Sequence, residues 1–212
     1  MRSFCGSPTV QLRVPVVLRL VCPALLFTAF ALQSARADSG GWTATLYGGP
    51  ATTNSSSQIF LHGDFRATGG TVGIAVDHEI VALGDGFALD GEGQLTRYIS
   101  SQPYSTASLG LGLRFSDFRW SDRVPTSVAL FTGPSYADDP PLISTGSDHG
   151  QPTNFRREKY LNYVGAELAV SISKSQDWSE VLCFYHRSGA FGLFAANADE
   201  GSTIGIGIRH RF

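Results

Sequence analysis

Cysteine, lysine and methionine are scarce in this chain of 212 residues, which contains three, two and one of them. Charge of either sign is not in large excess, because 16 basic residues stand against 18 acidic ones. This balance excludes the basic surface that is typical of nucleic-acid-binding proteins, so we expect no nucleic-acid partner. The 24 glycines and the 11% of aromatic residues instead favour an all-β chain with many turns.

The chain has one long hydrophobic run, Leu20–Leu32, which follows basic residues and precedes the small residues of Ala35–Ala37. This run is short for a membrane-spanning helix, which argues against an uncleaved anchor. The A-x-A pattern that follows it is that of a signal-peptide cleavage site. We therefore expect residues 1–37 to be a signal peptide that is cleaved after Ala37, and residues 38–212 to be the exported domain.

Cleavage at that site would change both the charge and the thiol content of the protein. Four arginines would leave with the signal peptide, so that 12 basic residues would remain against 18 acidic ones. Cys5 and Cys22 would leave as well. Cys183 would then be the sole cysteine, which excludes an intramolecular disulfide, and we expect it to be a packing residue.

The exported domain alternates apolar with polar or small residues along most of its length, which is the period of a β-strand. In the last run, Ile204 and Ile206 lie on one face, and Thr203 and Gly205 lie on the other. Eight such runs follow one another: 57–66, 71–81, 86–99, 105–115, 126–136, 160–173, 179–189 and 202–212. A ninth, Trp42–Gly49, either leads into the domain or replaces one of the weaker runs.

Two architectures produce this pattern. A soluble sandwich or barrel turns the apolar face inward, whereas an outer-membrane barrel turns it toward lipid. We favour the membrane barrel, because strands of about ten residues can cross a bilayer when tilted, and because the chain ends on Phe212, as bacterial outer-membrane barrels do. We therefore predict an all-β fold, an eight-stranded antiparallel transmembrane β-barrel of the bacterial outer membrane.

The polar face of the runs carries charged residues that suit the lumen of such a barrel. We expect Glu92, Glu167, Arg114 and Arg209 to form ion pairs there, because a narrow lumen is filled by side chains. The segment Ala137–Lys159 is polar and rich in proline and glycine, as extracellular loops are.

The segment FYHRSGAFGLF contains the residues that point most directly to chemistry. Strand alternation places His186 and Ser188 on the same face as apolar Leu182 and Phe184, with Arg187 on the opposite face. Since a charged arginine belongs in the lumen, His186 and Ser188 should face lipid. Counted back from the periplasmic C-terminus, Ser188 falls at the outer-leaflet end of its strand. A polar pair that faces hydrocarbon is costly unless it lies near the interface or has a function.

A serine hydroxyl is a weak nucleophile that needs a neighbouring base, and the base needs an acid that orients its ring. His186 can reach the hydroxyl of Ser188 from two residues away on the same face. In the connection that follows, Glu200 has the parity of the outward face when counted from Ile204, whereas Asp199 does not. We therefore expect Ser188, His186 and Glu200 to meet at the outer leaflet.

At these residues the sequence resembles the lipid A 3-O-deacylases, which are eight-stranded outer-membrane barrels with a His-x-Ser motif near the C-terminus. In that family a glutamate follows the serine after about a dozen residues, and here Glu200 follows Ser188 by twelve. The resemblance is strong over Leu182–Phe212. It implies that Ser188 is the nucleophile, His186 the general base and Glu200 the orienting acid. The implied reaction is hydrolysis of an ester-linked acyl chain of lipid A in lipopolysaccharide, without a metal or other cofactor.

One position departs from the family pattern. Gly189 stands where the family has an asparagine that helps to hold the oxyanion, so the backbone amides of Gly189 and Ala190 are the candidate donors here. The segment RSGAFGLF is also similar to uncharacterised exported barrels. Two alternatives therefore stay open: a structural or adhesive barrel without catalysis, and an outer-membrane phospholipase, whose family has a larger barrel and binds calcium.

The remaining expectations concern partners and metals. The histidines at His62, His78 and His149 are scattered in the sequence, so we expect no metal site among them. Outer-membrane lipids should surround the barrel, lipopolysaccharide would be the substrate, and a homodimer is compatible with the sequence.

Overall fold

The computed structural model describes residues 41–54, 56–140, 143–148, 151–172, 177–190, 193 and 199–212. The expected signal peptide, residues 1–37, lies outside the described residues. In chain order the elements are β1 (Trp42–Thr52), α2 (Ser56–His62), β2 (Gly69–Gly84), β3 (Phe87–Ile99), β4 (Tyr104–Phe115), β5 (Thr126–Ala137), β6 (Ile143–Asp148), β7 (Gln151–Arg156), β8 (Tyr160–Ser171), β9 (Trp178–Ser188) and β10 (Asp199–Arg211).

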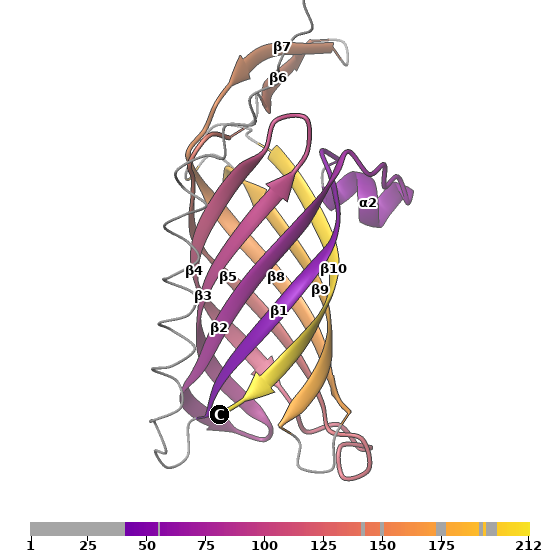
Figure 1. The fold of residues 1–212 in the computed structure, drawn as a ribbon, viewed down its shortest axis with the longest axis vertical. Helices are drawn as coiled ribbons and strands as arrows, with labels where there is room; N and C mark the ends of the chain where they lie inside the picture. Colours follow the sequence, from indigo (N-terminus) through magenta and orange to yellow (C-terminus); the bar gives the residue numbers. More distant parts are fainter. Residues whose placement is uncertain are drawn as a thin grey trace, which may run out of the picture. The chain divides into compact units, whose positions relative to one another are not determined.

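Eight of these strands form a closed barrel (Figure 1). Their order around the barrel is β1-β10-β9-β8-β5-β4-β3-β2, and the paired strands are antiparallel. The predicted eight-stranded antiparallel barrel is therefore confirmed. Within the segment 137–159, which the sequence marks as a loop, β6 and β7 form a separate two-stranded sheet.

The prediction for the first strand was wrong in its location. Residues 57–66 were expected to be a strand, but Ser56–His62 is the helix α2. The strand that closes the barrel is β1, which pairs with β10 on one side and with β2 on the other. The physical reason lies in Ile59, Phe60 and Leu61, three consecutive apolar residues that cannot all lie on one face of a strand.

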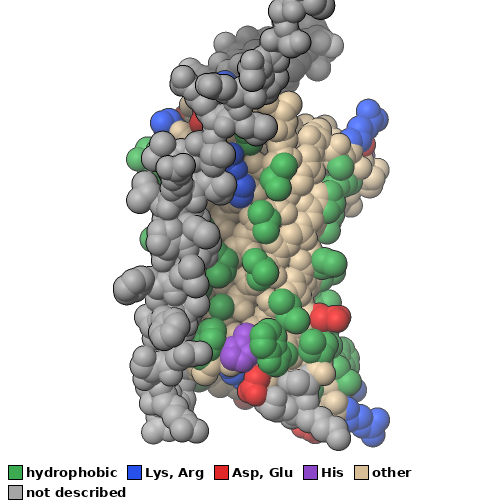
Figure 2. All heavy atoms as spheres, in the orientation of Figure 1, with side chains coloured by type: hydrophobic (Ala, Val, Ile, Leu, Met, Phe, Trp, Pro, Cys, Tyr) green, Lys and Arg blue, Asp and Glu red, His purple; other side chains and the backbone are tan. Residues whose placement is uncertain are grey.

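The barrel is apolar outside and polar inside. Large apolar side chains lie exposed on the outer wall (Figure 2). Leu109 is 67% exposed and Ile206 is 73% exposed. Threonine, serine, glutamine and charged side chains are buried on the inner face, including Thr45, Gln94 and Ser108. A closed barrel satisfies every strand without an open edge, so it can present such an apolar wall to hydrocarbon.

The middle of the lumen is filled by aromatic rings, which the alternation in the sequence did not reveal. Tyr47, Phe131, Tyr163 and Tyr185 are each at most 3% exposed and belong to one buried cluster. Glycines on the inner face make room for them: a Cβ atom at Gly112 would overlap the ring of Phe131. The interior is therefore packed rather than open, as expected for eight strands.

The two ends of the barrel differ. The amide of Phe212 donates to the carbonyl of Trp42 at 2.9 Å, so the first and last barrel strands meet at one end. The opposite end carries α2 and the segment with β6 and β7, and it is where β9 ends and β10 begins (Figure 1). Outer-membrane barrels have short periplasmic turns and longer extracellular loops, which makes this opposite end the extracellular one.

The part of the chain that the structure describes contains no helix with the length and apolar character needed to cross a membrane.

Candidate functional site

The strand β9 carries the residues that the sequence singled out. Arg187 is 3% exposed, and its guanidinium donates from Nε to Ser135 Oγ at 2.9 Å and from Nη2 to the Lys159 carbonyl at 3.2 Å. Its side chain therefore points into the lumen. His186 and Ser188 point to the other side by strand alternation, as predicted. Ser188 is the last residue of β9, at the extracellular end.

His186 lies on the outer side of the wall but is shielded from it. The side chain is 7% exposed, and its ring stacks on that of Phe184 with a centroid distance of 6.4 Å. The imidazole Nδ1 lies 3.0 Å from the Gly201 carbonyl oxygen and 3.1 Å from Ser202 Oγ. Ser202 Oγ in turn donates to the Asn54 carbonyl at 3.4 Å, so the chain that enters α2 runs beside this site.

The contact with Gly201 has a chemical consequence. A carbonyl oxygen can only accept, so Nδ1 must carry the proton when this hydrogen bond forms. In a neutral imidazole the other nitrogen, Nε2, is then an acceptor and can act as a base. This hydrogen bond therefore fixes both the tautomer and the orientation of the His186 ring.

Glu200 points the other way from the prediction. It is 5% exposed and forms an ion pair with Arg187 inside the lumen, so the outward side assigned to it from Ile204 was wrong. The β9–β10 ladder shifts register between Asp199 and Gly201, and this bulge turns Glu200 inward. Gly201 has φ +119°, a conformation that favours glycine.

His186 and Ser188, two of the three predicted catalytic residues, therefore lie two positions apart on one face of β9, whereas the side chain of Glu200 lies on the lumen side of the wall. Glu200 is the neighbour of Gly201, whose carbonyl contacts His186. Glu200 is therefore next in sequence to the residue that contacts His186, but its carboxylate bonds to Arg187. The catalytic roles of Ser188, His186 and Glu200 stay predictions.

The two oxyanion candidates follow Ser188 directly. Gly189 is buried, and Ala190 has φ +47°, which is uncommon for a residue other than glycine. The Ala190 carbonyl accepts a hydrogen bond from the amide of Leu193 at 3.1 Å. Backbone strain of this kind is frequent at functional sites, but the oxyanion role of both residues stays a prediction.

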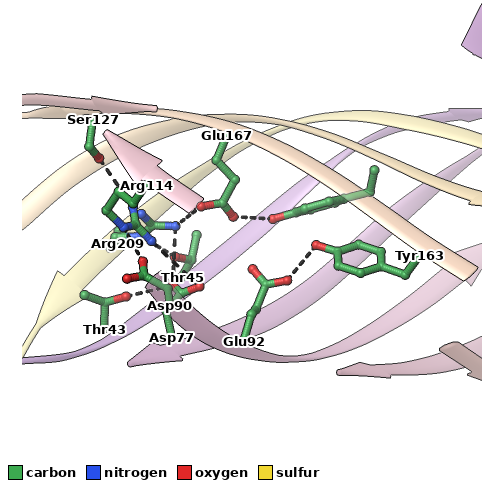
Figure 3. A network of polar contacts seen from close by, with 11 residues as sticks. Thr43, Thr45, Asp77, Asp90, Glu92, Arg114, Ser127, Tyr163, Glu167 and Arg209 are labelled. Atoms are coloured by element: carbon green, nitrogen blue, oxygen red, sulfur yellow. Dashed lines mark hydrogen bonds and ion pairs between the residues drawn. The ribbon is translucent and has the colours of Figure 1, made fainter. Parts of the chain in front are cut away.

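A second polar cluster lies deep in the lumen, and Figure 3 shows it from close by. Glu167 forms an ion pair with Arg209 and accepts from the Tyr185 hydroxyl at 2.6 Å, which confirms the predicted lumen pairing for these two charges. Arg114 pairs with Asp90. Glu92 was expected to form an ion pair, but its carboxylate instead accepts a hydrogen bond from the Tyr163 hydroxyl at 2.6 Å. These last partners were not predicted, because they depend on how the strands are aligned.

Asp77 joins this cluster and creates the one group among the described residues whose geometry suits a metal. Carboxylate oxygens of Asp77, Glu92 and Glu167 lie within 4.8 Å of one another, and all three side chains are buried. The Arg209 guanidinium lies 3.5 Å from Asp77 and also bonds to Glu167. Arginine thus already supplies positive charge to two of the three, so we read the group as an ion-pair network that stabilises the barrel.

Two cavities open at the ends of the lumen. The extracellular one, of about 210 Å³, is lined by Tyr98, Tyr104, Arg187 and Glu200 among others. The periplasmic one, of about 370 Å³, is lined by residues of the ion-pair network. The rings of Tyr98 and Tyr104 stack with their centroids 4.4 Å apart and line the extracellular cavity.

A closed eight-stranded antiparallel barrel with an apolar wall and a polar, packed interior defines the class: this is a small transmembrane β-barrel of the bacterial outer-membrane type. No protein-family model matches the chain. A search of curated proteins also finds no match.

Several solved structures of outer-membrane barrels are similar. Ail of Yersinia pestis in a phospholipid nanodisc is 14% identical with a TM-score of 0.44, and the match covers 82% of this chain and 100% of that chain. The N-terminal barrel domain of Pseudomonas aeruginosa OprF is 11% identical with a TM-score of 0.44, and the match covers 82% of this chain and 100% of that chain. Neisserial surface protein A is 13% identical with a TM-score of 0.46, and the match covers 82% of this chain and 97% of that chain. Identities and TM-scores this low carry no conclusion about function. The class rests on the strand pairing and the surface of this chain itself.

Proposed function

We propose that this protein is an exported outer-membrane esterase that hydrolyses an ester-linked acyl chain of lipid A in lipopolysaccharide. One observation carries the proposal: His186 is oriented by the Gly201 carbonyl at 3.0 Å, on the lipid side of the strand end where Ser188 lies. Lipid A forms the outer leaflet in bacteria that have lipopolysaccharide. We expect its ester bonds to lie at the depth of this strand end.

The chemistry follows from these positions. Nε2 of His186 accepts the proton of the Ser188 hydroxyl, and the serine oxygen attacks the acyl carbonyl carbon. Backbone amides of Gly189 and Ala190 stabilise the negative charge that develops on the carbonyl oxygen. The protonated histidine then gives its proton to the departing sugar alcohol. A water molecule, activated by the same histidine, releases the fatty acid from the serine.

Glu200 has a positioning role in this scheme. Its ion pair with Arg187 holds the bulge that contains Gly201, and the Gly201 carbonyl holds Nδ1 of His186. The carboxylate itself does not touch the reacting groups. This differs from the role that the family resemblance implies, in which the glutamate orients the histidine directly.

Mass spectrometry of lipid A tests the proposal. A lipopolysaccharide-producing host would express the wild-type protein, Ser188→Ala, His186→Gln or the control Ser179→Ala, which makes the same change on the same strand. We expect an acyl chain to be lost with the wild type and with Ser179→Ala, and to be retained with the other two. Unchanged lipid A with a folded wild-type barrel would overturn the proposal.

A second candidate is a barrel without catalytic activity. The Arg187–Glu200 ion pair favours this candidate, because it directs the Glu200 carboxylate to Arg187 and not to His186. Gly189 favours it as well, because it stands where the deacylase family has an asparagine. For such a barrel, the wild type, Ser188→Ala and His186→Gln would all give the same lipid A mass spectrum as the host without the protein.

A further inference from the structure

The helix α2 exposes large apolar side chains outside the barrel. It lies beside the wall near the extracellular end, next to β1 and β10 (Figure 1). Ile59 is buried at 9% exposure, whereas Phe60 is 67% exposed and Leu61 is 78% exposed. Burial of two adjacent apolar side chains of this size would stabilise the protein, and that stabilisation is lost where they stay in water. Their exposure therefore needs an explanation.

The depth of Phe60 along the wall supplies part of that explanation. Its ring meets the ring of Phe184 edge-on, with the centroids 4.8 Å apart. Phe184 lies on the outer face of β9, four residues before the strand ends at Ser188. At a rise of about 3.3 Å per residue, this is about 13 Å along the strand. With a strand tilt of about 40°, Phe60 reaches roughly 10 Å below the extracellular strand end.

The surface beside α2 is the lipid-facing wall itself. Leu46 of β1, Leu182 of β9 and Ile206 of β10 are 58%, 50% and 73% exposed. Phe60 and Leu61 thus continue the apolar surface of three consecutive strands. The charged residues of the same connection come after the helix: Asp64 and Arg66 form an ion pair at 3.1 Å, and the Arg66 side chain is 83% exposed.

The connection is fastened to the wall and does not hang free. Asn54 accepts at Oδ1 from the Thr52 hydroxyl at 2.6 Å and from the Arg66 amide at 3.3 Å. Its carbonyl accepts from Ser202 on β10 at 3.4 Å. The helix is therefore held against the barrel, with Ile59 buried and with Phe60 and Leu61 largely exposed.

We infer that α2 is embedded in the outer leaflet, where Phe60 and Leu61 bind the acyl chains of membrane lipids. Asp64 and Arg66 then lie at the level of the lipid head groups, as charged residues of an interfacial helix do. This inference goes beyond the proposed function and does not depend on it. It holds for a catalytic and for a non-catalytic barrel.

Fluorescence quenching tests the inference on the whole exported domain in phospholipid vesicles. Leu61→Cys would carry a thiol-reactive, polarity-sensitive dye, with Ile206→Cys as the lipid reference and Arg66→Cys as the water reference. Cys183 is 1% exposed and stays unlabelled in the folded protein, so it need not be changed. The quenchers are brominated lipid in the membrane and iodide in the water.

We expect brominated lipid to quench the dye at Leu61 within about twofold of the dye at Ile206, and iodide to quench mainly the dye at Arg66. A dye at Leu61 that iodide quenches as strongly as at Arg66, with no effect of brominated lipid, would overturn the inference. The heat-dependent gel shift of folded barrels verifies folding of each variant. Phe60→Cys replaces Leu61→Cys if the latter does not fold.

Discussion

At the scale of single residues, the side to which Glu200 points decides how the candidate site works. Alternation counted back from Ile204 predicts that the Glu200 carboxylate lies beside His186. The bulge between Asp199 and Gly201 instead directs this carboxylate into the lumen, where it pairs with Arg187. The histidine is then oriented by a backbone carbonyl, which no side-chain motif can reveal. His186 and Ser188 themselves lie on the face that the sequence predicted.

The Arg187–Glu200 pair leads to a prediction about stability. Glu200→Gln leaves the guanidinium of Arg187 buried without its counter-charge, which should cost about 3–5 kcal/mol of unfolding free energy. Urea unfolding in detergent micelles would measure the loss. The double variant Glu200→Gln with Arg187→Met removes both charges and should recover much of it. Equal stability of Glu200→Gln and wild type would show that the ion pair does not form.

At the scale of elements, the closure of the barrel depends on β1. This strand pairs with both β10 and β2, so without it each of those strands would be left with an open edge. The segment 57–66, which alternation alone offered as a strand, is instead occupied by the helix α2.

Two proline substitutions distinguish these assignments. Thr45→Pro removes a ladder hydrogen bond in β1, where Thr45 pairs with Arg209 and Ala75, and should abolish the folded form on a heat-modifiability gel. Ser57→Pro lies in the first turn of α2, where proline is tolerated, so that variant should fold. The reverse outcome would restore the original assignment of the first strand.

At the scale of the whole molecule, the ion-pair network in the lumen connects strands that are far apart in the sequence. Arg209 of β10 bonds to Glu167 of β8 and to Thr45 of β1, and lies near Asp77 of β2. Arg114 of β4 pairs with Asp90 of β3. These charges are largely buried, so the removal of one partner leaves an uncompensated charge and costs far more than the loss of an ion pair on a surface would.

Removal of the central acid should therefore affect the whole barrel. Glu167→Gln takes away the partner of Arg209 and weakens the hydrogen bond from Tyr185, and we expect a loss of about 3–5 kcal/mol of unfolding free energy. The control Glu79→Gln makes the same change at an exposed position of β2 and should leave stability within about 0.5 kcal/mol of wild type. Matching urea midpoints for the two variants would contradict the structural role of the network.

The sequence by itself determined which face of most barrel strands meets lipid. Hydrocarbon accepts only apolar side chains, so Leu109, Leu111 and Leu113 in one strand, and Ile206 in another, mark the outer wall without any knowledge of neighbours. The same alternation placed His186 outside and Arg187 inside. A period of two is a local property of a strand, so it can be read from the chain.

Only the tertiary structure decided what depends on strand alignment. It assigned the first strand to Trp42–Thr52, turned Glu200 inward at the bulge and gave Glu92 and Arg114 the partners Tyr163 and Asp90. It also laid α2 against the lipid-facing wall. Such outcomes follow from the register between strands and from the closure of the barrel, and a shift of one residue moves a side chain to the other side of the wall.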